Sequence, residues 1–210
     1  MKNPIAQLST SKAAMVTGVA FITSILIVSL VDDVLLANFL VPGDTAALAR
    51  DIEANPRLFG FAVVGYLLVL VLDSVIGLAL YVVLKPSSQK LALITAVLRL
   101  LYASILAIGL FALVIQVIDV YGYETIKSAG YVFFALHVFV LGYTVFKSGY
   151  IPKSIGALLI IASFTYVVFF VDLRLSEALE TVIMLTMAVA ELSLSIWLMV
   201  KRNSLPANSV

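Results

Sequence analysis

Long apolar runs separated by short polar segments make up most of the chain. Each run has about 20 residues, enough for an α-helix to cross the hydrocarbon core of a bilayer. The pattern therefore predicts an all-α, polytopic integral membrane protein in which residues 1–210 form a single domain, one bundle of six transmembrane helices. The first run exceeds the apolar core of a signal peptide, about 7 to 15 residues, so it is expected to remain as a helix. The predicted spans are 13–40, 58–84, 91–118, 129–146, 155–171 and 178–200.

The longest polar segment, 41–57, reads VPGDTAALARDIEANPR. Asp44 can cap a short helix in which Leu48 and Ile52 share a face, and Pro56 marks its end. Two interpretations remain open for this extracytoplasmic segment. It is either a short interfacial helix that covers a cavity or a solvated connector.

Lysine and arginine are concentrated on one side of the predicted bundle. The N-terminus, the loops after the second and fourth spans and the C-terminal tail carry eight basic and no acidic residues. The remaining loops carry four basic residues against eight acidic ones. By the positive-inside rule both termini are expected in the cytoplasm, and the protein in the cell membrane as a multi-pass protein.

The composition narrows the function classes. Hydrophobic residues are 63% of the chain and charged residues 12%, against about 25% charged residues in soluble domains. The absence of cysteine excludes disulfides and thiolate metal ligands, and a single histidine excludes a two-histidine haem. No cofactor is therefore expected. A net charge of +1 makes nucleic acid an unsuitable partner, and the expected partner is the lipid bilayer.

Four ionisable side chains fall inside the predicted spans, one each in the second, third, fourth and sixth. Counted from the cytoplasmic ends, all four lie roughly 12 to 16 Å deep at a helical rise of about 1.5 Å per residue. A charge that faces lipid there costs at least about 2.5 to 3.5 kcal/mol, so these side chains are predicted to face inward as one charged layer. They are Asp73, Arg99, His137 and Glu191.

The helix order favours particular partners within this layer. Asp73 and Arg99 lie on consecutive antiparallel helices, which predicts an ion pair. Glu191 can then pair with His137 or share Arg99, and Tyr102 can supply a hydroxyl nearby. The same residues also fit a purely structural role, because buried ion pairs can fix helix register.

Two further acids, Asp32 and Asp33, lie near the outer end of the first span. Neighbouring residues on a helix point in different directions, so both cannot face the bundle. At most one of them is expected to point inward.

Several strings along the chain are similar to a known family. They include DSVIGLALYVVLKP at 73–86, the LRLLYASIL run around Arg99, FFALHVFVLGYTVFKSGYIPKSIGALLIIA at 133–162 and AELSLSIWLMVK at the end. On these strings the chain resembles the bacterial and archaeal membrane proteins of domain-of-unknown-function family 4386. The resemblance implies a polytopic architecture and implies no reaction. It also implies that the four residues of the charged layer are shared, and it assigns no role to Asp32 and Asp33.

Three functions fit the charged layer. In the first, the bundle binds or transports a small polar or amphiphilic ligand, with Arg99 on an anionic group and His137 and Glu191 handling a proton. In the second, a membrane-embedded enzyme acts on a lipid-like substrate with His137 and Glu191 as catalytic acid and base. In the third, the protein is a structural or accessory subunit.

The presence of Arg99 in the layer favours ligand binding. The candidate ligand-binding residues are Arg99, Asp73, His137, Glu191 and Tyr102. A metal site is not expected, since one imidazole beside an arginine is a poor set of ligands for zinc or iron.

Overall fold

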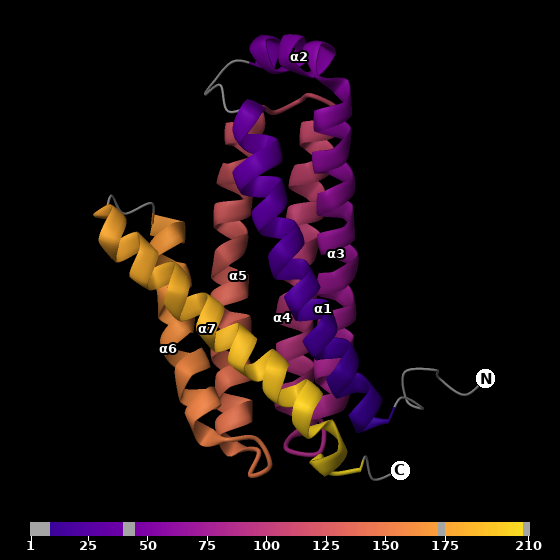
Figure 1. Ribbon diagram of the computed structural model, residues 1–210, viewed down its shortest axis with the longest axis vertical. Helices are drawn as coiled ribbons and strands as arrows, with labels where there is room; N and C mark the ends of the chain where they lie inside the picture. Colours follow the sequence, from indigo (N-terminus) through magenta and orange to yellow (C-terminus); the bar gives the residue numbers. More distant parts are fainter. Residues whose placement is uncertain (1–8, 40–44, 172–174, 208–210) are drawn as a thin grey trace, which may run out of the picture.

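The computed structural model describes residues 9–39, 45–171 and 175–207, and all the regular elements within these ranges are helices (Figure 1). The all-α prediction is therefore confirmed. The long elements are α1 (Thr10–Leu30), α2 (Thr45–Ala54), α3 (Pro56–Leu84), α4 (Gln89–Val114), α5 (Val120–Lys147), α6 (Lys153–Val171) and α7 (Glu177–Lys201). Short turns follow the first and last of them: the π-helical turn η2 (Val31–Leu35), the 3-10 turn η3 (Leu36–Phe39) and the 3-10 turn η4 (Arg202–Ser204).

Five helices are long and apolar enough to cross a membrane: Thr10–Leu35, Pro56–Leu84, Gln89–Val114, Val120–Lys147 and Ala178–Ser204. They correspond to five of the six predicted spans. The remaining predicted span, 155–171, coincides with α6, whose apolar part Lys153–Val168 is shorter than the other five helices. The first predicted span, 13–40, also differs, because its regular α-helix ends at Leu30 and the chain continues as η2 and η3.

Helix α5 begins at Val120, nine residues before the predicted start at 129. Asp119 causes the early start, because its side-chain Oδ1 accepts a hydrogen bond of 2.7 Å from the amide of Gly122 and so caps the helix. The assignment of Glu124 and Lys127 to a loop was therefore wrong. Both lie in α5, and Lys127 is only 5% exposed.

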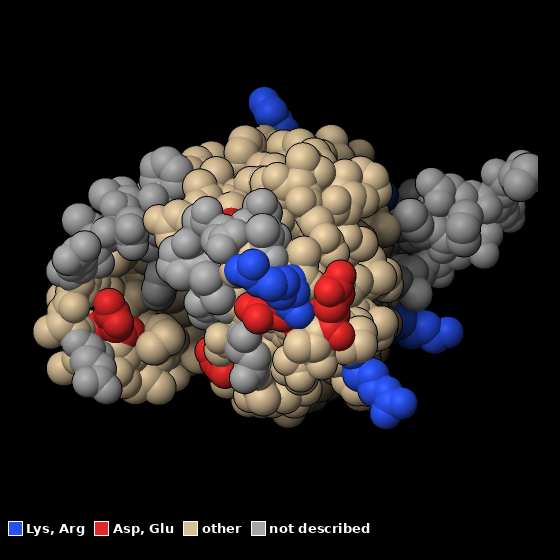
Figure 2. Space-filling view, turned by 90° about the horizontal axis from the view of Figure 1, so that it is seen from above, with Lys and Arg blue, Asp and Glu red and all other residues tan. Residues whose placement is uncertain are grey.

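A short helix within 41–57 is confirmed as α2. Leu48 is buried in an apolar cluster with Phe39 and Phe59, and Ile52 packs against the same cluster. The proposed cap Asp44 lies outside the described residues. Pro56 does follow the end of α2, and it is also the first residue of α3. Seen from the α2 end of the bundle, acidic and basic side chains lie together near the middle of that face (Figure 2).

Glycines permit two close helix contacts that position the rest of the bundle. A Cβ at Gly156 of α6 would lie 2.6 Å from the amide nitrogen of Phe146 and 2.8 Å from the carbonyl oxygen of Gly142, both in α5. A Cβ at Gly18 of α1 would lie 2.6 Å from the carbonyl oxygen of Ser195 in α7. No larger residue fits these sites without moving the backbone, so α5 packs tightly on α6 and α1 on α7.

Candidate ligand-binding cavity

Helices α1 and α7 are held together at one end of the bundle and diverge towards the other. They cross at Gly18 and Ser195, and the hydroxyl of Ser11 donates a 2.9 Å hydrogen bond to Oδ1 of Asn203 just beyond α7. From this crossing α7 runs obliquely away from α1 (Figure 1). The space between them is a cavity of about 310 Å³ that also reaches α3, α4, α5 and α6.

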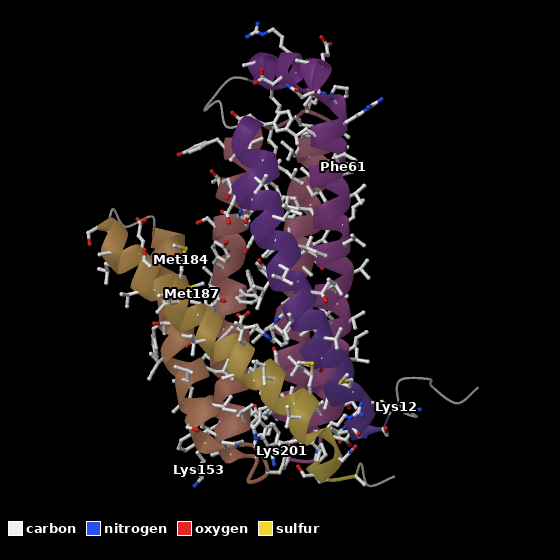
Figure 3. All side chains as sticks on the ribbon, viewed as in Figure 1. Lys12, Phe61, Lys153, Met184, Met187 and Lys201 are labelled. Atoms are coloured by element: carbon white, nitrogen blue, oxygen red, sulfur yellow. The ribbon has the colours of Figure 1, made fainter. Side chains whose placement is uncertain are left out.

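The cavity has an apolar and aromatic wall with a few ionisable groups. Its aromatic lining consists of Phe21, Tyr102, Tyr131, Phe134 and Tyr166. Its ionisable lining, tyrosines aside, consists of Asp32, Asp73, Arg99 and Glu191. Ser29 of α1 and Met184 of α7 line the cavity and are themselves exposed, so the cavity opens to the surface between these two helices. Met184 and Met187 lie along α7 on this side (Figure 3).

The predicted ion pair of Asp73 and Arg99 is confirmed. The Arg99 Nη2 and Nε atoms lie 2.5 Å and 3.2 Å from the same oxygen, Oδ1 of Asp73. The two side chains are 4% and 3% exposed. A pair this deeply buried is held by charge-assisted hydrogen bonds.

His137 completes this network from α5. Its Nδ1 lies 2.8 Å from the carbonyl oxygen of Thr95, and its Nε2 lies 3.3 Å from Nη1 of Arg99. A carbonyl only accepts and a guanidinium only donates, so Nδ1 carries the hydrogen and Nε2 accepts from Arg99. The ring is fully buried and does not line the cavity.

The faces of the Arg99 guanidinium are covered as well as its edge. Its central carbon lies 4.6 Å from the ring centre of Phe21 and 5.1 Å from that of Phe134, both within the range of cation–π contacts. Each of its three nitrogens already donates to Asp73 or His137. The hydrogen-bond donors of Arg99 are therefore used within the bundle, which weakens the expectation that it binds an anionic group.

Glu191 has a partner that the sequence did not suggest. Its Oε1 accepts a 2.6 Å hydrogen bond from the hydroxyl of Tyr166 in α6. The expected direct pairing with His137 or Arg99 was wrong: in the described parts of the chain Glu191 forms no ion pair, and Tyr166 is its side-chain hydrogen-bond partner. The oblique course of α7 explains this, because equal depth along a tilted helix does not bring two side chains together.

Tyr102 does lie at the cavity, as expected, and belongs to an aromatic cluster. Its ring centre is 4.7 Å from that of Phe134 and 6.3 Å from that of Tyr131. Tyr166 lies 4.8 Å from Phe134 and 6.1 Å from Tyr131 in the same way. These rings from α4, α5 and α6 thus form one cluster, and Tyr166 connects it to Glu191.

A second polar cluster, which the sequence did not predict, lies at the end of the cavity formed by η2. Lys127 Nζ lies 3.1 Å from Asp32 and 2.8 Å from Glu124, and the hydroxyl of Tyr66 donates to Asp32. Asp32 sits in the π-helical turn η2 and faces inward, whereas Asp33 is exposed. The expectation that only one of the two acids points inward is confirmed. A cap at Asp119 was the signal that could have placed Lys127 inside the bundle.

No group of three or more histidine and acidic side chains within the described ranges is arranged to hold a metal ion. The residues brought together at the cavity supply carboxylates, one arginine, tyrosine hydroxyls and aromatic faces. Such a mixture can bind a molecule with one polar group and an apolar remainder.

An all-helical fold with five helices suited to crossing a membrane, and ionisable groups buried among them, is that of a helical membrane protein. The chain belongs to the family described as domain of unknown function (DUF4386), whose sequence model matches residues 16–120 and 113–201. The first match contains Asp73 and Arg99, and the second contains His137 and Glu191. The resemblance seen in the sequence is thereby confirmed.

One curated relative was found in Archaeoglobus fulgidus and carries the description "Uncharacterized protein". It is 37% identical over 108 residues, which cover 51% of this chain and 64% of that relative. The aligned part of the chain thus spans somewhat under two thirds of the relative's length. No solved structure matches the chain.

Proposed function

We propose that this protein is a six-pass protein of the cell membrane that binds or transports a small amphiphilic ligand in the cavity between α1 and α7. The observation that carries the proposal is the cavity itself, about 310 Å³, with a buried carboxylate and aromatic rings on its wall. Its size lies at the lower end of the roughly 300 to 1,000 Å³ of small-molecule sites. Intramembrane acids commonly mark ligand sites.

The topology in this proposal rests on lengths and charges. Helix α6 has 19 residues, which at about 1.5 Å per residue give about 28 Å, close to the thickness of a hydrocarbon core. Lys12, Lys153 and Lys201 lie at the end of the bundle opposite α2 (Figure 3). With the sequence excess of basic residues on that side, the positive-inside rule supports a cytoplasmic position for both termini.

Entry from the bilayer fits the position of the opening. Leu26 and Leu30 of α1 and Leu185 of α7 are more than half exposed, as expected for side chains that face lipid. The cavity opens between these two helices, so an amphiphile can reach it laterally while its apolar part stays in hydrocarbon.

The other two functions receive unequal support. Catalysis by His137 and Glu191 needs both groups at one substrate, yet His137 is fully buried, lies outside the cavity lining and is bonded to Thr95 and Arg99. A structural role suits the network of Asp73, Arg99 and His137. It does not account for the cavity or for Glu191.

Native mass spectrometry of protein purified in mild detergent tests the proposal. The wild type is compared with Ala188→Phe, which places a ring in the cavity, and with Ala178→Phe, which adds the same ring at an exposed site of α7. A bound mass kept by the wild type and by Ala178→Phe but lost from folded Ala188→Phe supports binding in the cavity. Identical bound masses in all three proteins would contradict it.

A further inference from the structure

We infer that the ligand is a lipophilic cation, an amphiphile with an ammonium head group that binds at Glu191. This inference rests on the proposed ligand-binding function of the same cavity and adds the chemical class of the ligand. Three observations carry it. The lining has more carboxylates than cations, Glu191 has no cation partner among the described residues, and aromatic rings line the same cavity.

The lining carries more acid than base. Three carboxylates, those of Asp32, Asp73 and Glu191, face the cavity with one arginine. Asp73 is paired with Arg99, and Asp32 is paired with Lys127, which is not part of the lining. Within the described residues, Glu191 is the carboxylate of this lining that has no cation within ion-pair distance. An anionic ligand would meet this excess of acid, whereas a cation would balance it.

Glu191 has capacity left for a ligand. The residue is only 8% exposed, so water solvates it poorly, and leaving a buried carboxylate without a counter-charge is costly. One oxygen accepts from Tyr166, and the other accepts no hydrogen bond from the described residues. Glu191 lines the cavity, so an N–H group of a ligand can reach that second oxygen.

The surrounding rings favour an ammonium group over other donors. Tyr102, Tyr131 and Tyr166 line the same cavity as Glu191, and Tyr166 contacts it directly. Aromatic faces attract cations through their quadrupole. The faces of Phe21 and Phe134 already hold one cation in this way, the guanidinium of Arg99. The same kind of aromatic surface next to an unpaired carboxylate is suited to a second one.

The remainder of the lining suits an alkyl chain. Ile25, Val28 and Met187 form the walls towards the opening between α1 and α7. A head group at Glu191 therefore leaves the chain to run along these side chains to the hydrocarbon of the bilayer.

The test compares three probes with the same chain: dodecylammonium, dodecanol and dodecanoate. Each is titrated into wild-type protein in neutral detergent at pH 7, and the bound fraction is measured by native mass spectrometry. We expect dodecylammonium to bind at least about tenfold more tightly than either other probe, a difference of about 1.4 kcal/mol. This comparison needs no variant.

Matched variants locate the preference. Glu191→Gln keeps an acceptor for Tyr166 but removes the charge, and should bring the affinity for dodecylammonium down to that for dodecanol while dodecanol binding is unchanged. Glu180→Gln makes the same change at an exposed position of the same helix and should behave as the wild type. A melting temperature for each variant shows that it is folded.

The outcomes separate the two proposals. A wild-type preference for dodecanol or dodecanoate, or equal binding of all three probes, would overturn the cation assignment, while loss of that binding in Ala188→Phe would retain the cavity as the site. A preference for dodecylammonium that survives Glu191→Gln would also overturn the assignment. Binding that Ala188→Phe leaves intact for every probe would overturn both the ligand class and the proposed function.

Discussion

The two walls of the cavity hold their buried carboxylates in different ways. On the wall made by α3, α4 and α5, Asp73 is paired with Arg99, which is in turn fixed by His137 and two aromatic rings. On the wall made by α6 and α7, Glu191 has one tyrosine hydroxyl. As whole residues, Asp73 is 3% exposed and Glu191 8%, so burial does not distinguish them. The counter-charge does: Asp73 has a cation within hydrogen-bond distance, whereas Glu191 has none among the described residues.

The largest effect is expected at Asp73, on the wall made by α3, α4 and α5. Asp73→Asn leaves the charge of Arg99 buried without its partner and should lower the free energy of unfolding by about 3 to 5 kcal/mol. The double variant with Arg99→Gln removes both charges and should recover part of this loss. Thermal and denaturant unfolding in detergent measure both. Additive losses in the double variant would show that the pair is not a unit.

A smaller effect is expected from the backbone contact that supports the second wall. Gly156→Ala places a methyl group against the backbone of α5 and should push α6, which carries Tyr166, away from it, at a cost of about 1 to 3 kcal/mol. Gly60→Ala is the control, because a Cβ there meets nothing within 4 Å. Equal melting temperatures for the two variants would contradict the close packing of α5 on α6.

The comparison is sharpest at Glu191 itself. Glu191→Gln keeps an oxygen that accepts from Tyr166 and strands no cation, so it should change the unfolding free energy by less than about 1.5 kcal/mol. This is the same acid-to-amide change as Asp73→Asn, at a similar burial. The free energy of unfolding of the two variants is measured under the same conditions. Equal losses of stability at the two sites would remove the distinction between the walls.

The smallest effect lies outside both walls, at the turn between α5 and α6. Tyr150 donates a 2.8 Å hydrogen bond to the carbonyl oxygen of Val83, and burial raises the pKa of its hydroxyl to about 12. Because the unfolded value is about 10, this contribution to stability is complete below pH 10 and is lost as the pH rises towards 12. Unfolding between pH 9 and 12 should show this loss in the wild type and a flatter profile in Tyr150→Phe, with no change in the binding of any ligand.

The sequence predicted the partner of Asp73, on the wall made by α3, α4 and α5, better than the partner of Glu191, on the wall made by α6 and α7. Helix direction is the reason. Asp73 and Arg99 lie on neighbouring helices joined by a short turn and packed side by side, so equal depth brings them into contact. Helix α7 crosses the bundle obliquely, and depth counted along it misplaced the partner of Glu191. Tyr166 gave no signal, because tyrosine in an apolar run is compatible with a lipid-facing or a buried position.

Spans were easier to predict than their ends. Apolar length alone located α6 and the five described helices that are long enough to cross a membrane, since a spanning helix needs about 20 mostly apolar residues. The start of α5 was missed because Glu124 and Lys127 resembled a polar loop, although Lys127 is neutralised by Asp32 and Glu124 within the bundle. A paired charge inside a helix and a free charge in a loop are identical in a sequence, and their partners distinguish them only after folding.

The crossing of α1 and α7 at Gly18 also has a consequence for how the protein is made. Helix α1 precedes the other described helices and α7 follows the other long ones, so the helix on one side of the cavity opening leaves the ribosome early and the helix on the other side leaves it late. The cavity has no second side until α7 has been inserted and has packed against Gly18. Under the proposed function, the cavity therefore begins to retain a ligand only after α7 has packed on the helices that precede it, so retention marks a correctly assembled bundle.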